Sequence, residues 1–80
     1  MLTRCLARAL APSIRVNAVA PGTIILENER RSTTRIPLRR IPLRRYGAPT
    51  DITDLVVFLA KRAGYVTGQV FAVDGGRSIA

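Results

Sequence analysis

The 80-residue sequence is poor in several residue types from which common functional sites are built. It has one cysteine, Cys5, and no histidine, so no intramolecular disulfide is possible and a zinc site is disfavoured. Tryptophan is absent and aromatic residues make up 5% of the chain, which leaves few rings for stacking on bases. No stretch approaches the roughly 18 consecutive apolar residues of a membrane span. We therefore expect no metal site and no membrane segment.

The N-terminus lacks the clean apolar run of a secretory signal, because Arg4 and Arg8 interrupt it. A single cysteine also suits a reducing compartment. We therefore expect a cytoplasmic protein. Its length allows at most one small domain, which buries only a modest fraction of its surface.

The charge is strongly basic, with 13 lysines and arginines, five acidic residues and a formal net charge of +8. Such a balance can serve a polyanion partner: nucleic acid, an acidic membrane surface or a phosphate-bearing ligand. Seven arginines lie within residues 30–45, where they could contact phosphates or form a solvated surface. Prolines and isoleucines separate them where a nucleic-acid site would need aromatics. The pattern favours a solvated surface over nucleic-acid binding.

Two segments, residues 14–20 and 69–73, are nearly continuous in apolar character, which is typical of strands in a parallel sheet covered on both faces. A helix predicted over residues 50–62 lies between them, so the connection is long enough for parallel pairing. An amphipathic helix predicted over residues 2–11 comes first. The order helix, strand, helix, strand predicts an α/β fold that is part of a doubly wound parallel sheet, because two strands alone are not a stable parallel sheet.

The helix over residues 50–62 has local signals at both ends. Thr50 is the candidate N-cap, and Asp51 in the first turn complements the helix dipole. Gly64 is the candidate left-handed cap after the last turn. The apolar stripe of this helix is formed by Ile52, Leu55, Val56 and Leu59.

Four other features have structural interpretations. Asn17 lies in a predicted strand and is expected to be a buried hydrogen-bonding side chain. Asp74–Gly76 offers one carboxylate, too few for a metal site, and is expected to form a turn. Cys5 and Tyr65 are both expected to pack against apolar neighbours.

Three blocks carry a family likeness: Ile14–Gly22, Ile41–Ile52 and Tyr65–Gly76. Their order and spacing resemble the C-terminal segment of short-chain dehydrogenases/reductases. The resemblance covers nearly the whole chain and is weakest over residues 27–40. It implies a Rossmann-type sheet and hydride transfer with NAD(P)(H), without deciding between NADH and NADPH.

The resemblance also implies a nicotinamide-contacting turn formed by Pro21, Gly22, Thr23 and Ile24. Bare backbone after the carboxyl end of a strand can bond the carboxamide, at the edge where such sheets bind ligands. Many relatives have threonine at the position of Leu26. That threonine would reach the pyrophosphate of the cofactor. Leu26 cannot donate such a hydrogen bond, so Leu26, with Glu27 next to it, is expected to face the substrate.

The catalytic motif that the resemblance implies, Tyr-x-x-x-Lys, is missing from the chain. Tyr46 is followed four residues later by Thr50, and Tyr65 by Gln69. The glycine-rich dinucleotide fingerprint is absent as well. We assign no catalytic residue, and we expect residues 1–80 to be a partial NAD(P)-binding Rossmann-like domain that lacks the N-terminal dinucleotide-binding and catalytic parts. The isolated chain is expected to be inactive.

The sequence thus favours a fragment of an NAD(P)-dependent oxidoreductase that supplies the nicotinamide-side loop and the substrate rim. Within the family, Pro21–Glu29 and Val73–Ser78 are most similar to pteridine reductases. The resemblance implies a small carbonyl or pterin substrate and a homo-oligomer for a complete enzyme. Two alternatives stay open: a non-catalytic truncated remnant, because the upstream sheet is missing, and a small basic nucleic-acid-binding protein, because of the arginines.

Overall fold

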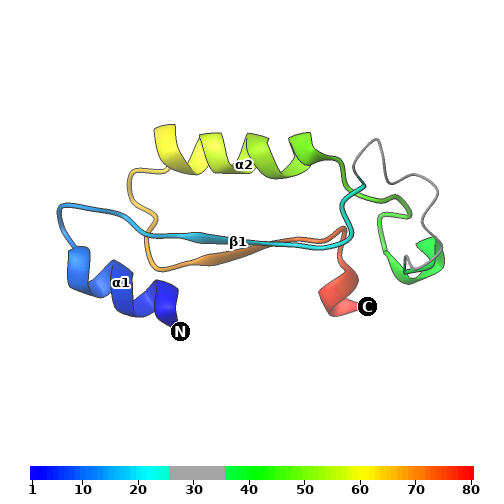
Figure 1. The fold of residues 1–80 in the computed structure, drawn as a ribbon, viewed down its shortest axis with the longest axis horizontal. Coiled ribbons are helices and arrows are strands. Elements are labelled where there is room, and N and C mark those ends of the chain that lie inside the picture. Colours follow the sequence, from blue (N-terminus) through cyan, green and yellow to red (C-terminus); the bar gives the residue numbers. More distant parts are fainter. Residues whose placement is uncertain (26–35) are drawn as a thin grey trace.

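The computed structural model describes residues 1–25 and 36–80. Their elements are α1 (Leu2–Leu10), β1 (Ala18–Pro21), the 3-10 helix η2 (Leu38–Arg40), α2 (Pro49–Lys61), β2 (Val70–Val73) and the 3-10 helix η3 (Arg77–Ile79). β1 and β2 pair in parallel, with Ala18 opposite Val70 and Pro21 opposite Val73. Figure 1 shows α2 along one face of this pair, with α1 and η3 on the other side at opposite ends of the strands. The predicted α/β order and parallel pairing are confirmed.

β1 begins at Ala18, later than the strand predicted over residues 14–20. Just before β1, hydrogen bonds of the Asn17 side chain connect the two chain segments. Asn17 Nδ2 donates to the carbonyl of Val66 at 2.9 Å, and Asn17 Oδ1 accepts from the backbone N–H of Gln69 at 3.1 Å. The amide thus joins the two chain segments just ahead of the paired strands. The predicted structural role of Asn17 is confirmed.

α2 begins at Pro49, and its N-cap is Ala48, so the prediction of Thr50 as N-cap is wrong. The cause is Pro49. A proline holds the preceding residue in an extended conformation, here φ −108° and ψ 160° at Ala48, and its ring suits the first helical position. Ala48 has no side-chain acceptor, so the cap consists of Asp51, whose Oδ2 accepts the Ala48 N–H at 2.7 Å. Asp51 does lie in the first turn, as predicted.

The carboxyl end of α2 is closed by an arginine from another segment. Gly64 does not have a positive φ, so its predicted left-handed cap is wrong, and the C-cap is Arg62 with φ −124°. Arg15, which precedes β1, donates to the carbonyls of Ala63 at 2.9 Å and Ala60 at 3.3 Å. Ala60 lies in the last turn of α2, where the carbonyls have no partner within the helix. Arg15 thereby fastens the end of α2 to the sheet.

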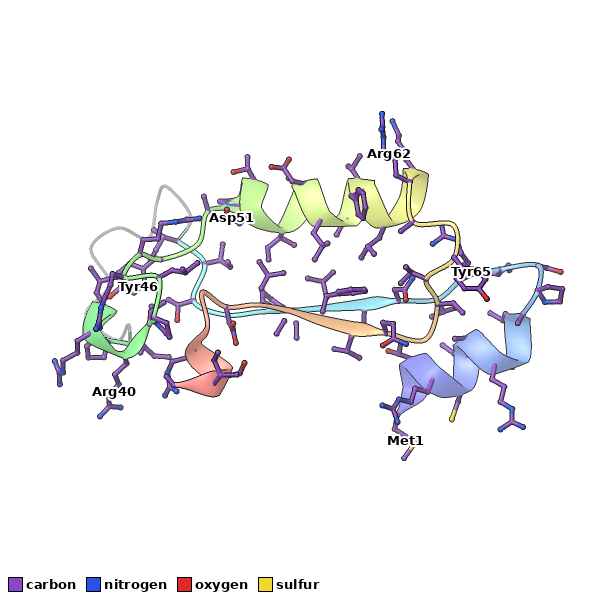
Figure 2. The ribbon with its side chains drawn as sticks, turned by 180° about the vertical axis from the view of Figure 1, so that it is seen from behind. Met1, Arg40, Tyr46, Asp51, Arg62 and Tyr65 are labelled. Carbon is purple, nitrogen blue, oxygen red and sulfur yellow. The ribbon has the colours of Figure 1, made fainter. Side chains whose placement is uncertain are left out.

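The core of the described residues is small. Its buried apolar residues are Ala7, Ile41, Leu59 and Ala63. Tyr65 is fully exposed and Cys5 is exposed, so their predicted packing roles are wrong. α1 buries only Ala7, and Tyr65 lies in the connection beyond the end of α2 (Figure 2). Large apolar side chains such as Phe58 and Val70 are more than half exposed, as expected for part of a larger sheet.

Candidate functional site

The carboxyl ends of β1 and β2 border an open cavity of about 260 Å³. Its walls come from the loop after β1, the segment that leads into α2, and the end of β2 with its turn. The lining residues are Thr23, Ile41, Leu43, Arg45, Gly47, Asp51, Ala72, Val73, Asp74, Gly75 and Gly76. Parallel α/β sheets bind ligands at this edge. The cavity is therefore our candidate site.

The four predicted cofactor residues lie at this edge. Pro21 is the last residue of β1, and the N–H of Gly22 continues the pairing by donating to the carbonyl of Val73 at 2.9 Å. Thr23 lines the cavity and Ile24 is half-buried beside it. The backbone N–H groups of Thr23 and Ile24 are bonded to no residue within 1–25 or 36–80. They remain available as donors to a ligand.

Gly22 is needed here for close approach and not for a positive φ. A Cβ at this position would lie 2.7 Å from both the Cα and the Cβ of Asp74. The loop after β1 therefore packs its backbone directly on the start of the turn after β2. The predicted substrate residues, Leu26 and Glu27, lie outside the described residues.

The turn after β2 is organised by one carboxylate. Asp74 Oδ1 accepts the N–H of Gly76 at 2.9 Å, and its Oδ2 accepts the N–H of Ser78 at 3.0 Å. The Ser78 hydroxyl, with these backbone donors, lowers the pKa of Asp74. Gly75 and Gly76 have φ of 63° and 91°, which favours glycine. The predicted structural turn is confirmed, and residues 1–25 and 36–80 contain no cluster of three metal-ligating side chains.

Gly47 clamps the loop after β1 from the other side. Its N–H donates to the carbonyl of Thr23 at 2.9 Å, and its carbonyl accepts the N–H of Ile25 at 2.8 Å. A Cβ on Gly47 would lie 2.4 Å from Ile24 Cδ1. In the sequence, Gly47 stands out only as part of a family block, and this contact could not be predicted from it. A glycine two residues before a helix-starting proline was the one local signal.

An ion pair stands next to Gly47. Arg45 Nη1 and Nη2 lie 3.1 Å and 3.2 Å from the two carboxylate oxygens of Asp51. The Arg45 hydrogen bond, followed by that from Ala48 N–H, lowers the pKa of Asp51, and the same pair raises the pKa of Arg45. Tyr46 and Asp51 lie together at this end of the molecule in Figure 2. Sequence reasoning assigned Asp51 to the helix dipole alone and missed its partner.

The sequence Ile-Pro-Leu-Arg-Arg occurs twice in a row, at residues 36–40 and 41–45, and its four arginines differ in what they contact. Arg45 is paired with Asp51, and Arg44, at φ 58°, donates to the carbonyl of Arg39. Arg39 and Arg40 are exposed, and Arg40 points away from the ribbon in Figure 2. Only the three residues of η2 are helical between Ile36 and Arg45, in line with the helix-breaking prolines. Two of the four arginines thus bond within the protein.

The described part of the site can bind and orient a ligand, but it holds no acid/base pair. It offers backbone donors, two carboxylates and one arginine. The hydroxyl of Tyr46 donates to the carbonyl of Ile36 at 2.7 Å.

Neither α1 nor α2 is long and apolar enough to cross a bilayer.

Sequence comparison identifies relatives of this chain. The family described as enoyl-(acyl carrier protein) reductase matches residues 1–78. The 3-oxoacyl-(acyl-carrier-protein) reductase FabG of Thermotoga maritima is 44% identical over 84 residues, covering 94% of this chain and 32% of that protein. A Streptomyces violaceoruber protein assigned as ketoacyl reductase 2 of the granaticin polyketide synthase is 46% identical over 79 residues, covering 92% and 31%. The chain therefore spans about a third of the length of these relatives.

Solved structures of short-chain dehydrogenases/reductases resemble this chain in the same way as the relatives found by sequence. A short-chain dehydrogenase/reductase from Brucella melitensis matches 99% of this chain and 34% of its own, with a TM-score of 0.85 and 38% identity. An Agrobacterium tumefaciens protein assigned as a 2-deoxy-d-gluconate 3-dehydrogenase matches 99% and 35%, with a TM-score of 0.82 and 39% identity, and contains bound NADP. The Rossmann-type fold and the NAD(P) cofactor class of the full-length family are confirmed. On the family match and these structures together, the chain belongs to the short-chain dehydrogenase/reductase family.

Proposed function

We propose that this chain forms the nicotinamide-side loop and part of the substrate rim of an NAD(P)H-dependent reductase that acts on 3-oxoacyl thioesters. The observation that carries the proposal is the pair of N–H groups on Thr23 and Ile24, which donate to no described residue, at the carboxyl edge of the parallel strands beside the cavity. A cytoplasmic location and a homo-oligomeric enzyme stay predictions.

The loop is built to present those donors. Gly22 is bonded to β2 and Gly47 to Thr23 and Ile25, so the loop is fixed at both ends. Within residues 1–25 and 36–80, nothing accepts from the two N–H groups between these bonds. Fixed donors lose little entropy when a ligand binds. A nicotinamide carboxamide has a carbonyl oxygen that can accept from such a donor. The described residues therefore fit the cofactor that the family uses.

Bound cofactor would supply the hydride, which is transferred to the keto carbon while a proton is added to the oxygen. The proton donor must come from outside these residues, because the chain has no Tyr-x-x-x-Lys. The role of this chain is then to orient the cofactor ring through Thr23 and Ile24 and to wall the cavity with Asp74 and Arg45. Orientation of the reactants is itself a large part of catalysis.

The choice of 3-oxoacyl thioester follows the names of the two relatives, both ketoacyl reductases and both more than 40% identical to this chain. Pteridine reduction is the second candidate. It rests on the likeness of Val73–Ser78 and of the loop beginning at Pro21. The two substrates differ in the reducible group, a ketone in one and a ring imine in the other, so one assay can separate them.

A reconstituted reductase would test the proposal. In this fusion, the part of the Thermotoga maritima reductase that precedes its match to this chain is joined to residues 1–80. NADPH oxidation is followed with acetoacetyl-CoA and with dihydropterin, and the parent reductase is the positive control. We expect turnover of acetoacetyl-CoA by the reconstituted reductase and none by the 80-residue chain alone, which has no acid/base pair.

Three outcomes would contradict parts of the proposal. Oxidation of NADPH only with dihydropterin would favour a pteridine reductase. A fusion that melts cooperatively and binds NADPH but turns over neither substrate would contradict both. Turnover by the 80-residue chain alone would refute the division of labour proposed for the proton donor.

A further inference from the structure

Asp51 is bonded on both sides of Gly47, the residue that clamps the nicotinamide-side loop. Its carboxylate accepts from the guanidinium of Arg45 at 3.1 Å and 3.2 Å and from the N–H of Ala48 at 2.7 Å. A Cβ on Gly47 would lie 3.7 Å from Asp51 Oδ2. The carboxylate therefore lies against Gly47, bonded to the backbone that follows it and to the Arg45 side chain that precedes it.

Gly47 passes this constraint to the loop through two backbone bonds. Its N–H and carbonyl are bonded to Thr23 and Ile25, and Ile24 forms a parallel bridge with it. Ile24 carries one of the two N–H groups assigned to the cofactor. Thr23, Gly47 and Asp51 line one cavity, so the chain of contacts ends at the ligand space.

We propose that Asp51 is a positioning residue for the nicotinamide cofactor, acting through Gly47 on the backbone of Thr23 to Ile25. The proposal rests on the proposed function of the loop. A residue that only capped α2 would stabilise the helix start and leave the loop unaffected. Asp51 does cap Ala48, but its bond to Arg45 spans Gly47, which a helix cap does not require.

Amide hydrogen exchange in the 80-residue chain separates the two roles. In Asp51→Asn, we expect the Ile25 and Gly47 amides to exchange about fivefold faster, the ratio typical of losing one N-terminal capping interaction. The amides of Gly22 and Arg62 are internal references. They are bonded to Val73 and Phe58, outside the Asp51 contacts, and should not change.

Two variants complete this experiment. Asp54→Asn removes an exposed carboxylate one turn further along α2 and should leave all four amides as in the parent. Asp51→Glu should restore protection, because glutamate at the same helix position can reach the preceding N–H. Equal acceleration of all four amides, or no change at Ile25 and Gly47, would overturn the positioning role.

Cofactor kinetics in the reconstituted reductase provide the second measurement. Asp51→Asn should raise KM for NADPH by about fivefold with kcat within about twofold, because the change weakens ligand orientation and leaves the proton donor intact. Asp51→Glu should return KM toward the parent value. An unchanged KM would contradict the proposal. If the parent fusion is itself inactive, the proposed function fails while the amide exchange still decides whether Asp51 fixes the loop.

Discussion

The two ends of the parallel strands are held by different kinds of contact. At the carboxyl ends, hydrogen bonds join three segments. Gly22 in the loop after β1 is bonded to β2, and Gly47 in the segment before α2 is bonded to the same loop. Arg45 in that last segment forms an ion pair with Asp51 in the first turn of α2. At the amino ends, hydrogen bonds of the Arg15 and Asn17 side chains also join the segments, but the packing is loose: α1 buries only Ala7 and leaves Leu2 at 71% exposure. Figure 1 shows α1 alone beneath that end of the strands.

This difference separates the contacts that the segment makes within itself from the apolar surface that it leaves exposed. Around the cavity, the hydrogen bonds of Gly22, Gly47 and Asp74 each join one described residue to another. The apolar faces are not complete. Parallel strands are normally covered on both faces, yet Val70 is 58% exposed and Phe58 is 52% exposed. The loop beside the cavity is held by local hydrogen bonds, whereas much of the apolar surface of the described residues is exposed.

Gly22→Ala is expected to cause the largest loss of stability at the carboxyl ends of the strands. The new Cβ would lie 2.7 Å from backbone of Asp74, and backbone cannot rotate aside. Overpacking of this kind costs about 1–3 kcal/mol. We expect the free energy of unfolding to fall by this amount, measured by urea denaturation monitored with circular dichroism.

Two glycines provide matched controls for that substitution. Gly47→Ala meets the tip of the Ile24 side chain, which can move, so the loss should be smaller than for Gly22→Ala. Gly64→Ala meets nothing within 4 Å and should be neutral or stabilising by about 0.4–1 kcal/mol. A loss at Gly64 as large as at Gly22 would contradict the close contact with Asp74.

Arg15→Met tests one of the polar contacts near the amino ends, the bonds between Arg15 and the end of α2. The substitution keeps most of the apolar stem and removes the donors to Ala60 and Ala63. Losing hydrogen bonds from a charged group at a helix carboxyl end should cost about 1–2 kcal/mol of unfolding free energy. Arg62→Met is the control, because the side chain of Arg62 points away from the molecule in Figure 2. Equal losses in both variants would remove the capping role of Arg15.

Acid should destabilise the turn after β2 by protonating Asp74. The Ser78 hydroxyl and the N–H of Gly76 lower the pKa of Asp74 from its ordinary value of 3.8. A carboxyl with a lowered folded pKa contributes stability that is fully present above its ordinary pKa and is lost as the pH falls through the folded pKa. We expect the urea midpoint to be flat at neutral pH and to fall below pH 3.8.

Two substitutions locate this acid effect. Asp74→Asn should make the fall shallower, leaving the part due to Asp51, whose pKa is also lowered. Asp54→Asn, at an exposed position, should keep the slope of the parent. An unchanged slope in Asp74→Asn would show that the turn does not depend on its carboxylate.

The sequence was sufficient to predict the parallel strands, the crossover helix and the Asp74 turn, because each has a pattern along the chain. It misplaced the helix start, since the constraint that Pro49 imposes on Ala48 outweighed the capping preference of Thr50. It missed the clamp at Gly47, which joins residues more than twenty positions apart and leaves no periodic signal. The packing expected of Tyr65 failed because no described residue covers that side chain.

Val70→Thr makes the smallest change and tests the comparison most directly. The two side chains have the same shape, but threonine places a hydroxyl on the open face of the sheet. In the 80-residue chain, where Val70 is 58% exposed, water can bond that hydroxyl, and the free energy of unfolding should change by less than about 0.5 kcal/mol. In the reconstituted reductase, the same hydroxyl should become buried and cost about 1–3 kcal/mol. Equal losses in the two proteins would show that this face stays open, and the division between a local site and a shared core would then fail.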